Sequence, residues 1–104
     1  MKTLLTDFQG TRIRLTRERA AHILEHPEMS GMDSVIEETL KNPEQVVESL
    51  SDESAHLYYR FYIGTRVGNK YLCVVVKIVN DDAFVLTAYL TNAVKKGRTL
   101  WPRR

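Results

Sequence analysis

Hydrophobic residues follow two different periods along this chain. Between residues 17 and 41 apolar side chains recur every three or four positions, whereas from residue 57 onward they alternate with polar ones. A spacing of three or four predicts amphipathic helices, and alternation predicts strands. The pattern therefore predicts a helical first half followed by a run of adjacent strands.

Two helices are predicted in the first half. Thr16 suits the N-cap of a helix over residues 17–25, and Pro27 ends it because proline disfavours helix in the residue before it. A second helix is expected to start at a cap formed by Asp33 or Ser34 and to stop before Asn42-Pro43.

The segments around these helices carry weaker signals. Residues 4–8 and 12–15 alternate only in part around Gly10, which predicts an opening strand pair or one bent strand. The apolar residues of the segment after the second helix, Val46, Val47 and Leu50, do not decide between element types.

The second half predicts a meander of three strands. Residues 57–63, 71–79 and 84–91 alternate, with turn-forming clusters at residues 64–70 and 80–82. Helices followed by adjacent strands indicate an α+β fold. We expect one domain over residues 1–104, with two N-terminal helices packed on one face of an antiparallel, meander-type β-sheet.

Alternation also sorts the strand residues onto two faces of the expected sheet. One face is predominantly apolar and is expected to be the core side: Leu57, Tyr59, Phe61, Ile63, Leu72, Val74, Val76, Ile78, Phe84, Leu86, Ala88 and Leu90. The other face mixes cations, phenols and hydroxyls: Tyr58, Arg60, Tyr62, Tyr71, Cys73, Val75, Lys77, Val85, Thr87, Tyr89 and Thr91.

The mixed face suits a nucleic acid. Arg60 and Lys77 can neutralise phosphates, while tyrosines stack on bases or donate hydrogen bonds. The same composition also fits the ordinary solvent side of a half-buried sheet, where tyrosine and threonine are favoured.

A polar stripe borders the apolar side of the first helix. Arg19, His22 and His26 lie within about 60° of one another at about 100° per residue. Histidine can take and return a proton near neutral pH, which RNA cleavage through the 2′-hydroxyl requires. Both histidines are equally compatible with an exposed helix surface. A metal site from His22 and His26 is the third interpretation, but the chain lacks an HExxH motif and a second cysteine.

Charge divides the chain although its formal net charge is only +2 over 104 residues. Residues 1–52 hold six Lys/Arg and ten Asp/Glu, a balance of −4, whereas residues 53–104 hold nine and three, a balance of +6. Residues 95–104, which include Lys95 and Lys96, hold five cations and no acid. Such a tail suits phosphates or an acidic protein partner, and it also fits a solvated basic terminus.

Cysteine usage and hydropathy indicate the compartment. A single cysteine, Cys73, cannot form an intrachain disulfide, which favours a reducing compartment, and we expect the cytoplasm. The N-terminal apolar stretch is too short for a signal peptide, and the longest apolar run, residues 71–76, is too short to span a bilayer.

Several short motifs occur in a fairly specific order over residues 12–101. They are LTRERAAHILEHPEM at residues 15–29, LKNPE at 40–44, YYR at 58–60, YLCVVVK at 71–77 and VLTAY at 85–89. In this combination the chain resembles the phage and mobile-element nucleases of the barnase/EndoU/colicin/RelE (BECR) class.

The resemblance implies a function and a set of residue roles. It implies a metal-independent RNase of toxin type, needing no cofactor, held by an acidic antitoxin protein, and cutting RNA to a 2′,3′-cyclic phosphate and a 5′-hydroxyl. His22 or His26 would be the general base or acid, and Lys77 and Arg60 would stabilise the transition state. Thr87 and Tyr89 would position the phosphate. Substrate contacts are expected from Arg19, Tyr58, Arg60, Tyr62, Lys95 and Lys96. The alternative is a non-catalytic RNA-binding or protein-interaction module on the same scaffold.

Overall fold

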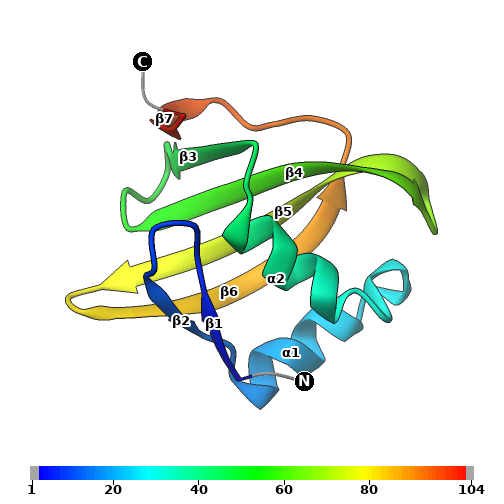
Figure 1. The fold of residues 1–104 in the computed structure, drawn as a ribbon, viewed down its shortest axis with the longest axis horizontal. Helices are drawn as coiled ribbons and strands as arrows, with labels where there is room; N and C mark the ends of the chain where they lie inside the picture. Colours follow the sequence, from blue (N-terminus) through cyan, green and yellow to red (C-terminus); the bar gives the residue numbers. More distant parts are fainter. Residues whose placement is uncertain (1–2, 103–104) are drawn as a thin grey trace.

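The computed structural model describes residues 3–102, and its elements follow the predicted order with two additional strands (Figure 1). The helical elements are α1 (Arg17–Leu24), a 3-10 turn η1 (Pro27–Met29) and α2 (Asp33–Lys41). The strands are β1 (Leu4–Thr6), β2 (Arg12–Arg14), β3 (Gln45–Ser49), β4 (Ala55–Thr65), β5 (Gly68–Val79), β6 (Asp82–Thr91) and β7 (Gly97–Trp101).

All seven strands form one sheet in the order β1-β2-β6-β5-β4-β3-β7. The α+β class and the position of both helices on one face are confirmed, because α1 and α2 share a core cluster with β4, β5 and β6. The expectation of a purely antiparallel sheet is wrong, since β2 pairs with β6 in parallel at Arg14 and Phe84. In Figure 1 the two helices lie in front of the sheet.

The helix boundaries agree closely with the sequence pattern. Thr16 caps α1, since its hydroxyl oxygen accepts a hydrogen bond from the Arg19 amide at 3.2 Å. The predicted cap of α2 is wrong by one residue, because Met32 is the N-cap and makes no side-chain capping bond.

Strand β4 has the opposite orientation to the one predicted. Tyr58 pairs with Val74 and therefore faces the helices, whereas Tyr59 pairs with Cys73 and faces away from them. Large apolar or aromatic residues occupy both sides of this strand, so alternation does not identify the core side. The cross-strand register decides it. We call the side covered by α1 and α2 the helix face, and the side carrying Tyr59, Cys73 and Val75 the strap face.

A β-bulge changes the orientation of β6. Val75 pairs with Thr87 while the next residue of β5, Val76, pairs with Val85, so Leu86 is an extra residue in β6. Val85 therefore belongs to the core under the helices, and Leu86 packs against the strap-face cluster. The predicted positions of both residues are wrong for this reason.

The segment over residues 92–96, which we call the strap, gives the strap face its name. It connects β6 to β7, although β5, β4 and β3 lie between these strands (Figure 1). Its Val94 packs against the strap-face cluster, and the Lys95 amide donates to the Tyr59 hydroxyl at 3.1 Å. The strap therefore crosses the sheet on the side opposite the helices.

The length of the strap requires a curled sheet. Six residue steps from Thr91 to Gly97 span at most about 21 Å. Crossing four strand spacings takes about 19 Å. Gly97 also lies further along the strand direction than Thr91, by the distance from Tyr71 to Lys77 on β5, which is about 20 Å. A flat sheet would need a diagonal of about 28 Å, so the sheet must curve around the strap face.

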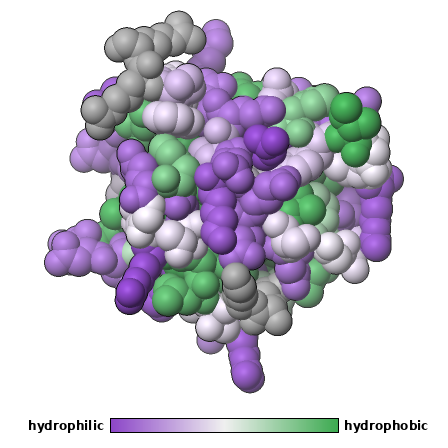
Figure 2. Space-filling model, viewed as in Figure 1, coloured by the Kyte–Doolittle hydropathy of each residue, from purple (hydrophilic) through white to green (hydrophobic). Residues whose placement is uncertain are grey.

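The helix side of the surface is mainly polar, with scattered apolar side chains between charged ones (Figure 2). Within residues 3–102 no helix is long and apolar enough to cross a membrane.

The buried Asp7 predicts a measurable stability effect. Its Oδ2 accepts a hydrogen bond from the Tyr58 hydroxyl at 2.7 Å, and Oδ1 accepts from the amides of Gln9 and Thr11. Tyr58→Phe leaves one buried carboxylate oxygen without this donor and should lower the free energy of unfolding by about 1–3 kcal/mol in urea denaturation. Tyr71→Phe, which removes a hydroxyl without a hydrogen-bond partner among the described residues, should change it by less than about 0.5 kcal/mol.

The close approach of β7 to β3 gives a second prediction. A Cβ at Gly97 would collide with the Glu48 carbonyl oxygen and lie 2.6 Å from Val47 Cγ1. Gly97→Ala should therefore lower the free energy of unfolding by about 1–3 kcal/mol, measured in urea. Thr99→Ala, an exposed change on the same strand, is the control; equal effects from both would contradict this account.

Candidate functional site

The sheet separates the predicted catalytic residues into two groups. His22 lies on α1 and His26 just after it, both exposed and both on the helix face. Their Nδ1 atoms lie 3.6 Å from the carboxylates of Glu25 and Glu28. Thr87 faces the opposite side of the sheet, so the structure does not bring the two histidines together with it.

Arg60 also lies on the helix face, together with Arg19 of α1. Its Nη1 donates to the Asn42 carbonyl at 2.8 Å, and its Nε lies 3.8 Å from a Glu38 carboxylate oxygen. Alternation predicted that Arg60 and Lys77 share one face of the sheet, and this prediction is wrong. The orientation of β4 is the cause.

Tyr58 and Tyr62 are structural groups of the helix face. Tyr58 is 3% exposed and holds Asp7, and its pKa is raised by burial and by that carboxylate. The Tyr62 hydroxyl contacts Thr39 at 3.1 Å and donates to Glu38 at 2.8 Å, while burial raises its pKa to about 12. Neither phenol is placed to contact a substrate on the strap face.

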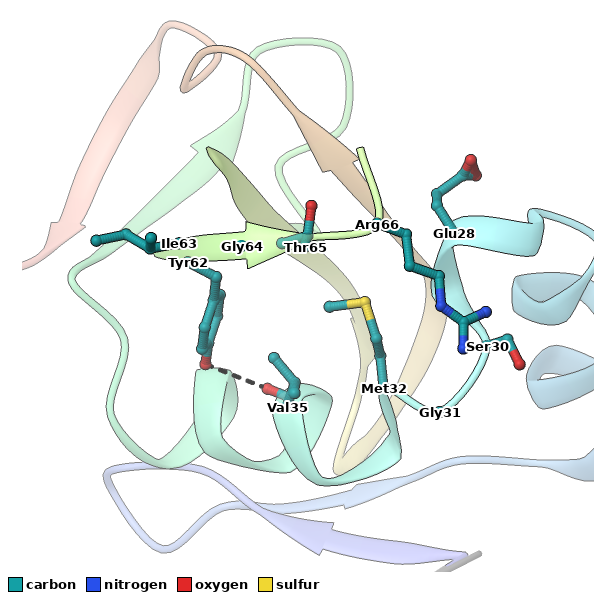
Figure 3. A pocket seen from close by; sticks show the side chains of 10 residues that line it. All are labelled: Glu28, Ser30, Gly31, Met32, Val35, Tyr62, Ile63, Gly64, Thr65 and Arg66. Atoms are coloured by element: carbon teal, nitrogen blue, oxygen red, sulfur yellow. Dashed lines mark hydrogen bonds between the residues drawn. The ribbon is translucent and has the colours of Figure 1, made fainter. Parts of the chain in front are cut away.

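Tyr62 also borders a hollow of about 350 Å³ between α2 and the β4–β5 turn (Figure 3). Met32, Val35 and the Tyr62 ring form its apolar wall, and the Tyr62 hydroxyl points to the Val35 carbonyl. Arg66 closes one end, where its Nη1 donates to the Pro27 carbonyl at 3.3 Å. This hollow contains none of the predicted catalytic residues.

A second hollow, of about 500 Å³, lies on the strap face and brings four predicted residues together. It is bounded by the sheet, the strap and the β3–β4 loop. Thr87, Tyr89, Lys95 and Lys96 are among its lining residues, which also include Ser49, Leu50, Ser51, Asp52, Ala55, Leu57, Val75 and Leu86. We call it the strap-face hollow.

Lys77 borders this hollow through Asp52. Its ammonium group forms a hydrogen-bonded ion pair with the Asp52 carboxylate. Hydrogen bonds from Lys77 and from Ser54 lower the pKa of Asp52 to about 2. At neutral pH the Asp52 carboxylate is therefore ionised, and both groups lie on the same side of the sheet as Thr87.

The strap places Lys95 and Lys96 over the hollow. The Lys95 ammonium lies 5.8 Å from the centre of the Tyr89 ring. Among residues 3–102, neither lysine forms an ion pair, whereas the nearby Arg98 is bound by Glu48 at 2.6 Å. Arg103 and Arg104, also counted in the basic tail, lie outside the described residues.

Two phenols and a thiol form one row across the strap face. Tyr59, Cys73 and Tyr89 are cross-strand neighbours on β4, β5 and β6. Burial raises the pKa of the Cys73 thiol, raises that of Tyr89, and raises that of Tyr59 to about 12. All three groups therefore keep their protons at neutral pH.

The sequence patterns did not identify several residues of this hollow. Asp52 was not among the predicted site residues, and its position beside Lys77 follows from the pairing of β4 with β5, in which Ala55 lies opposite Lys77. Alternation predicts Leu57 on the core side under the helices, but the structure has it in the floor of this hollow. Within the described chain, no group of three His, Cys, Asp or Glu side chains is arranged to hold a metal ion.

The third histidine, His56, lies away from the hollow and gives a prediction for stability. It is half-buried beside Gln9, and burial lowers its pKa, with Arg98 adding to the effect and Glu48 and Asp7 opposing it. The unfolded chain then binds more protons than the folded one below about pH 6.5, so the free energy of unfolding falls as pH decreases.

His56→Gln should remove this part of the fall. Urea denaturation between about pH 7.5 and pH 5 should show the variant gaining stability relative to wild type as the pH is lowered. Parallel profiles for the two proteins would contradict the lowered pKa.

Comparison with protein-family models, curated proteins and solved structures finds no match to this chain. The resemblance to BECR nucleases therefore remains an expectation from the sequence.

Proposed function

We propose that this protein binds RNA at the strap-face hollow and cleaves its backbone there without a metal ion. The observation that carries the proposal is the grouping of Lys95 and Lys96 with Thr87 and Tyr89 around one hollow, beside Lys77. The cations suit phosphate oxygens, while the hydroxyl and phenol can donate hydrogen bonds to them.

The charges favour this hollow over the helix face as the site for an anion. Lys95 and Lys96 have no carboxylate partner among the described residues, so they lose no ion pair when a phosphate binds. On the helix face, Arg60 is bound by Glu38, and each helical histidine lies near a glutamate. A phosphate there would compete with these carboxylates for the cations. The strap-face hollow also has a carboxylate, that of Asp52, but it is paired with Lys77 and not with Lys95 or Lys96.

Cleavage at this site would use the RNA's own 2′-hydroxyl. The 2′-oxygen forms a bond to phosphorus, the bond from phosphorus to the 5′-oxygen breaks, and the products are a 2′,3′-cyclic phosphate and a 5′-hydroxyl. The lysines would stabilise the added negative charge of the transition state. Tyr89, which keeps its proton, would donate it to the departing 5′-oxygen, and the Asp52 carboxylate would accept the 2′-proton.

The proposal revises the roles expected from the sequence. His22, His26 and Arg60 have no part in it, because the sheet lies between them and the hollow. Asp52 replaces the histidines as proton acceptor, although a pKa of about 2 makes it a weak base. Charge stabilisation by the lysines would therefore contribute most of the rate enhancement.

The second candidate is a non-catalytic RNA-binding or protein-interaction module. The absence of a histidine from the strap face within residues 3–102, and the pairing of Lys77 with Asp52, favour it over an efficient enzyme. An acidic protein, such as an antitoxin, would bind the same lysines. Turnover separates the two candidates.

The lysines predict a salt-dependent loss of RNA binding. Lys95→Ala/Lys96→Ala should weaken binding of an unstructured RNA, and the slope of log affinity against log salt should decrease by about 1.4. Arg17→Ala/Arg19→Ala removes the same charge from the helix face and is the matched control. Fluorescence anisotropy at several salt concentrations measures both. Equal losses in the two variants would indicate only a general effect of net charge.

Cleavage is tested in EDTA with a labelled RNA. Wild type and His22→Ala/His26→Ala should both produce fragments with a 2′,3′-cyclic phosphate, while Tyr89→Phe should slow cleavage at least tenfold. Loss of cleavage in the histidine variant alone would overturn the proposed site. Tight, lysine-dependent binding with no product would identify the non-catalytic module instead.

A further inference from the structure

Leu50 is the most unusual side chain around the strap-face hollow. It follows β3, is 79% exposed, and lines the hollow. An apolar side chain this exposed contributes little to the core. Its position at the rim of a hollow means that a ligand entering there would cover it.

The interior of the hollow is suited to a flat, largely apolar group. Leu57 and Val75 of the sheet and Leu86 of the bulge form an apolar floor. The Tyr89 ring stands at the same hollow, with the Lys95 ammonium over it. The volume of about 500 Å³ falls within the range of small-molecule sites.

The polar side chains at the hollow suit the edge of a flat ligand rather than its faces. Ser49 and Ser51 of the β3–β4 loop present hydroxyls that lie 3.1 Å from each other, and Thr87 presents a third. Hydroxyls donate and accept, so they can match the mixed donors and acceptors of a nucleobase edge.

We infer that the strap-face hollow holds a single unpaired nucleobase between Leu50 and the Tyr89 ring, where the base replaces the Lys95 ammonium, and that the flanking phosphate then binds Lys95 and Lys96. This inference rests on the proposed function and identifies its substrate class as single-stranded RNA. A base inside a duplex is stacked and paired, so it cannot enter the hollow without being extruded. Stacking of the base on an aromatic ring also explains how a small hollow can bind RNA without an extended interface.

The test uses 2′-O-methyl oligonucleotides, which lack the attacking hydroxyl and stay intact during the measurement. In fluorescence anisotropy, an abasic residue at one position of an unstructured oligonucleotide should weaken binding to wild type about tenfold. Leu50→Ser should weaken binding of the intact oligonucleotide by a similar factor. The abasic change should then have little further effect, because both changes remove the same contact.

Leu24→Ser is the matched control. Leu24 is an exposed leucine on α1, on the other side of the sheet, and its replacement should leave both affinities unchanged. A hairpin that pairs every base of the same sequence should bind wild type at least tenfold more weakly than the unstructured form.

The outcomes separate the two proposals. Three results would overturn the nucleobase site. Wild type and Leu50→Ser could bind the intact oligonucleotide equally well, or the abasic residue could weaken binding to Leu50→Ser as much as to wild type. The third is that an abasic residue does not weaken binding to wild type at any position. In those cases, lysine-dependent binding would still support the proposed function. Absence of binding by wild type to any RNA overturns both.

Discussion

The strap must join β6 to β7 across three intervening strands in only five residues, and the shape of the protein depends on this constraint. A chain of that length cannot cross a flat seven-stranded sheet, so the sheet curves toward it. The bond from the Lys95 amide to the Tyr59 hydroxyl and the packing of Val94 hold the strap against the sheet. The strap-face hollow is the space left between this crossing and the β3–β4 loop.

A sheet buried on both sides explains why the candidate site is where it is. The helices cover one face with an apolar core, and the strap covers part of the other. Side chains that reach a ligand on the strap face must come from the uncovered rows of β4, β5 and β6, from the strap, or from the loop before β4. The helical histidines meet none of these conditions, whatever their chemistry.

The sequence patterns predicted the elements well and the faces poorly. Both helices, the opening strand pair and the three long strands follow from spacing and capping. The short strands β3 and β7 were not predicted, because a strand of five residues carries little periodic signal. On β4, aromatic and apolar residues at both parities hid the orientation, and on β6 the extra residue Leu86 reversed it. Alternation did place Thr87 and Tyr89 on the face away from the helices, and the strap brings Lys95 and Lys96 to the same hollow.

The sequence by itself determined the α+β class, the helix boundaries and the concentration of positive charge in the second half, because these depend on local spacing and composition. Only the tertiary structure decided which charges share a face. The strand register, the bulge in β6 and the short strap bring together Lys77, Thr87, Tyr89 and the strap lysines. The same features put Arg60 and the histidines on the other side of the sheet. The physical reason is that a shift of one residue in a strand moves every side chain through the sheet, and pairing between distant segments sets that shift.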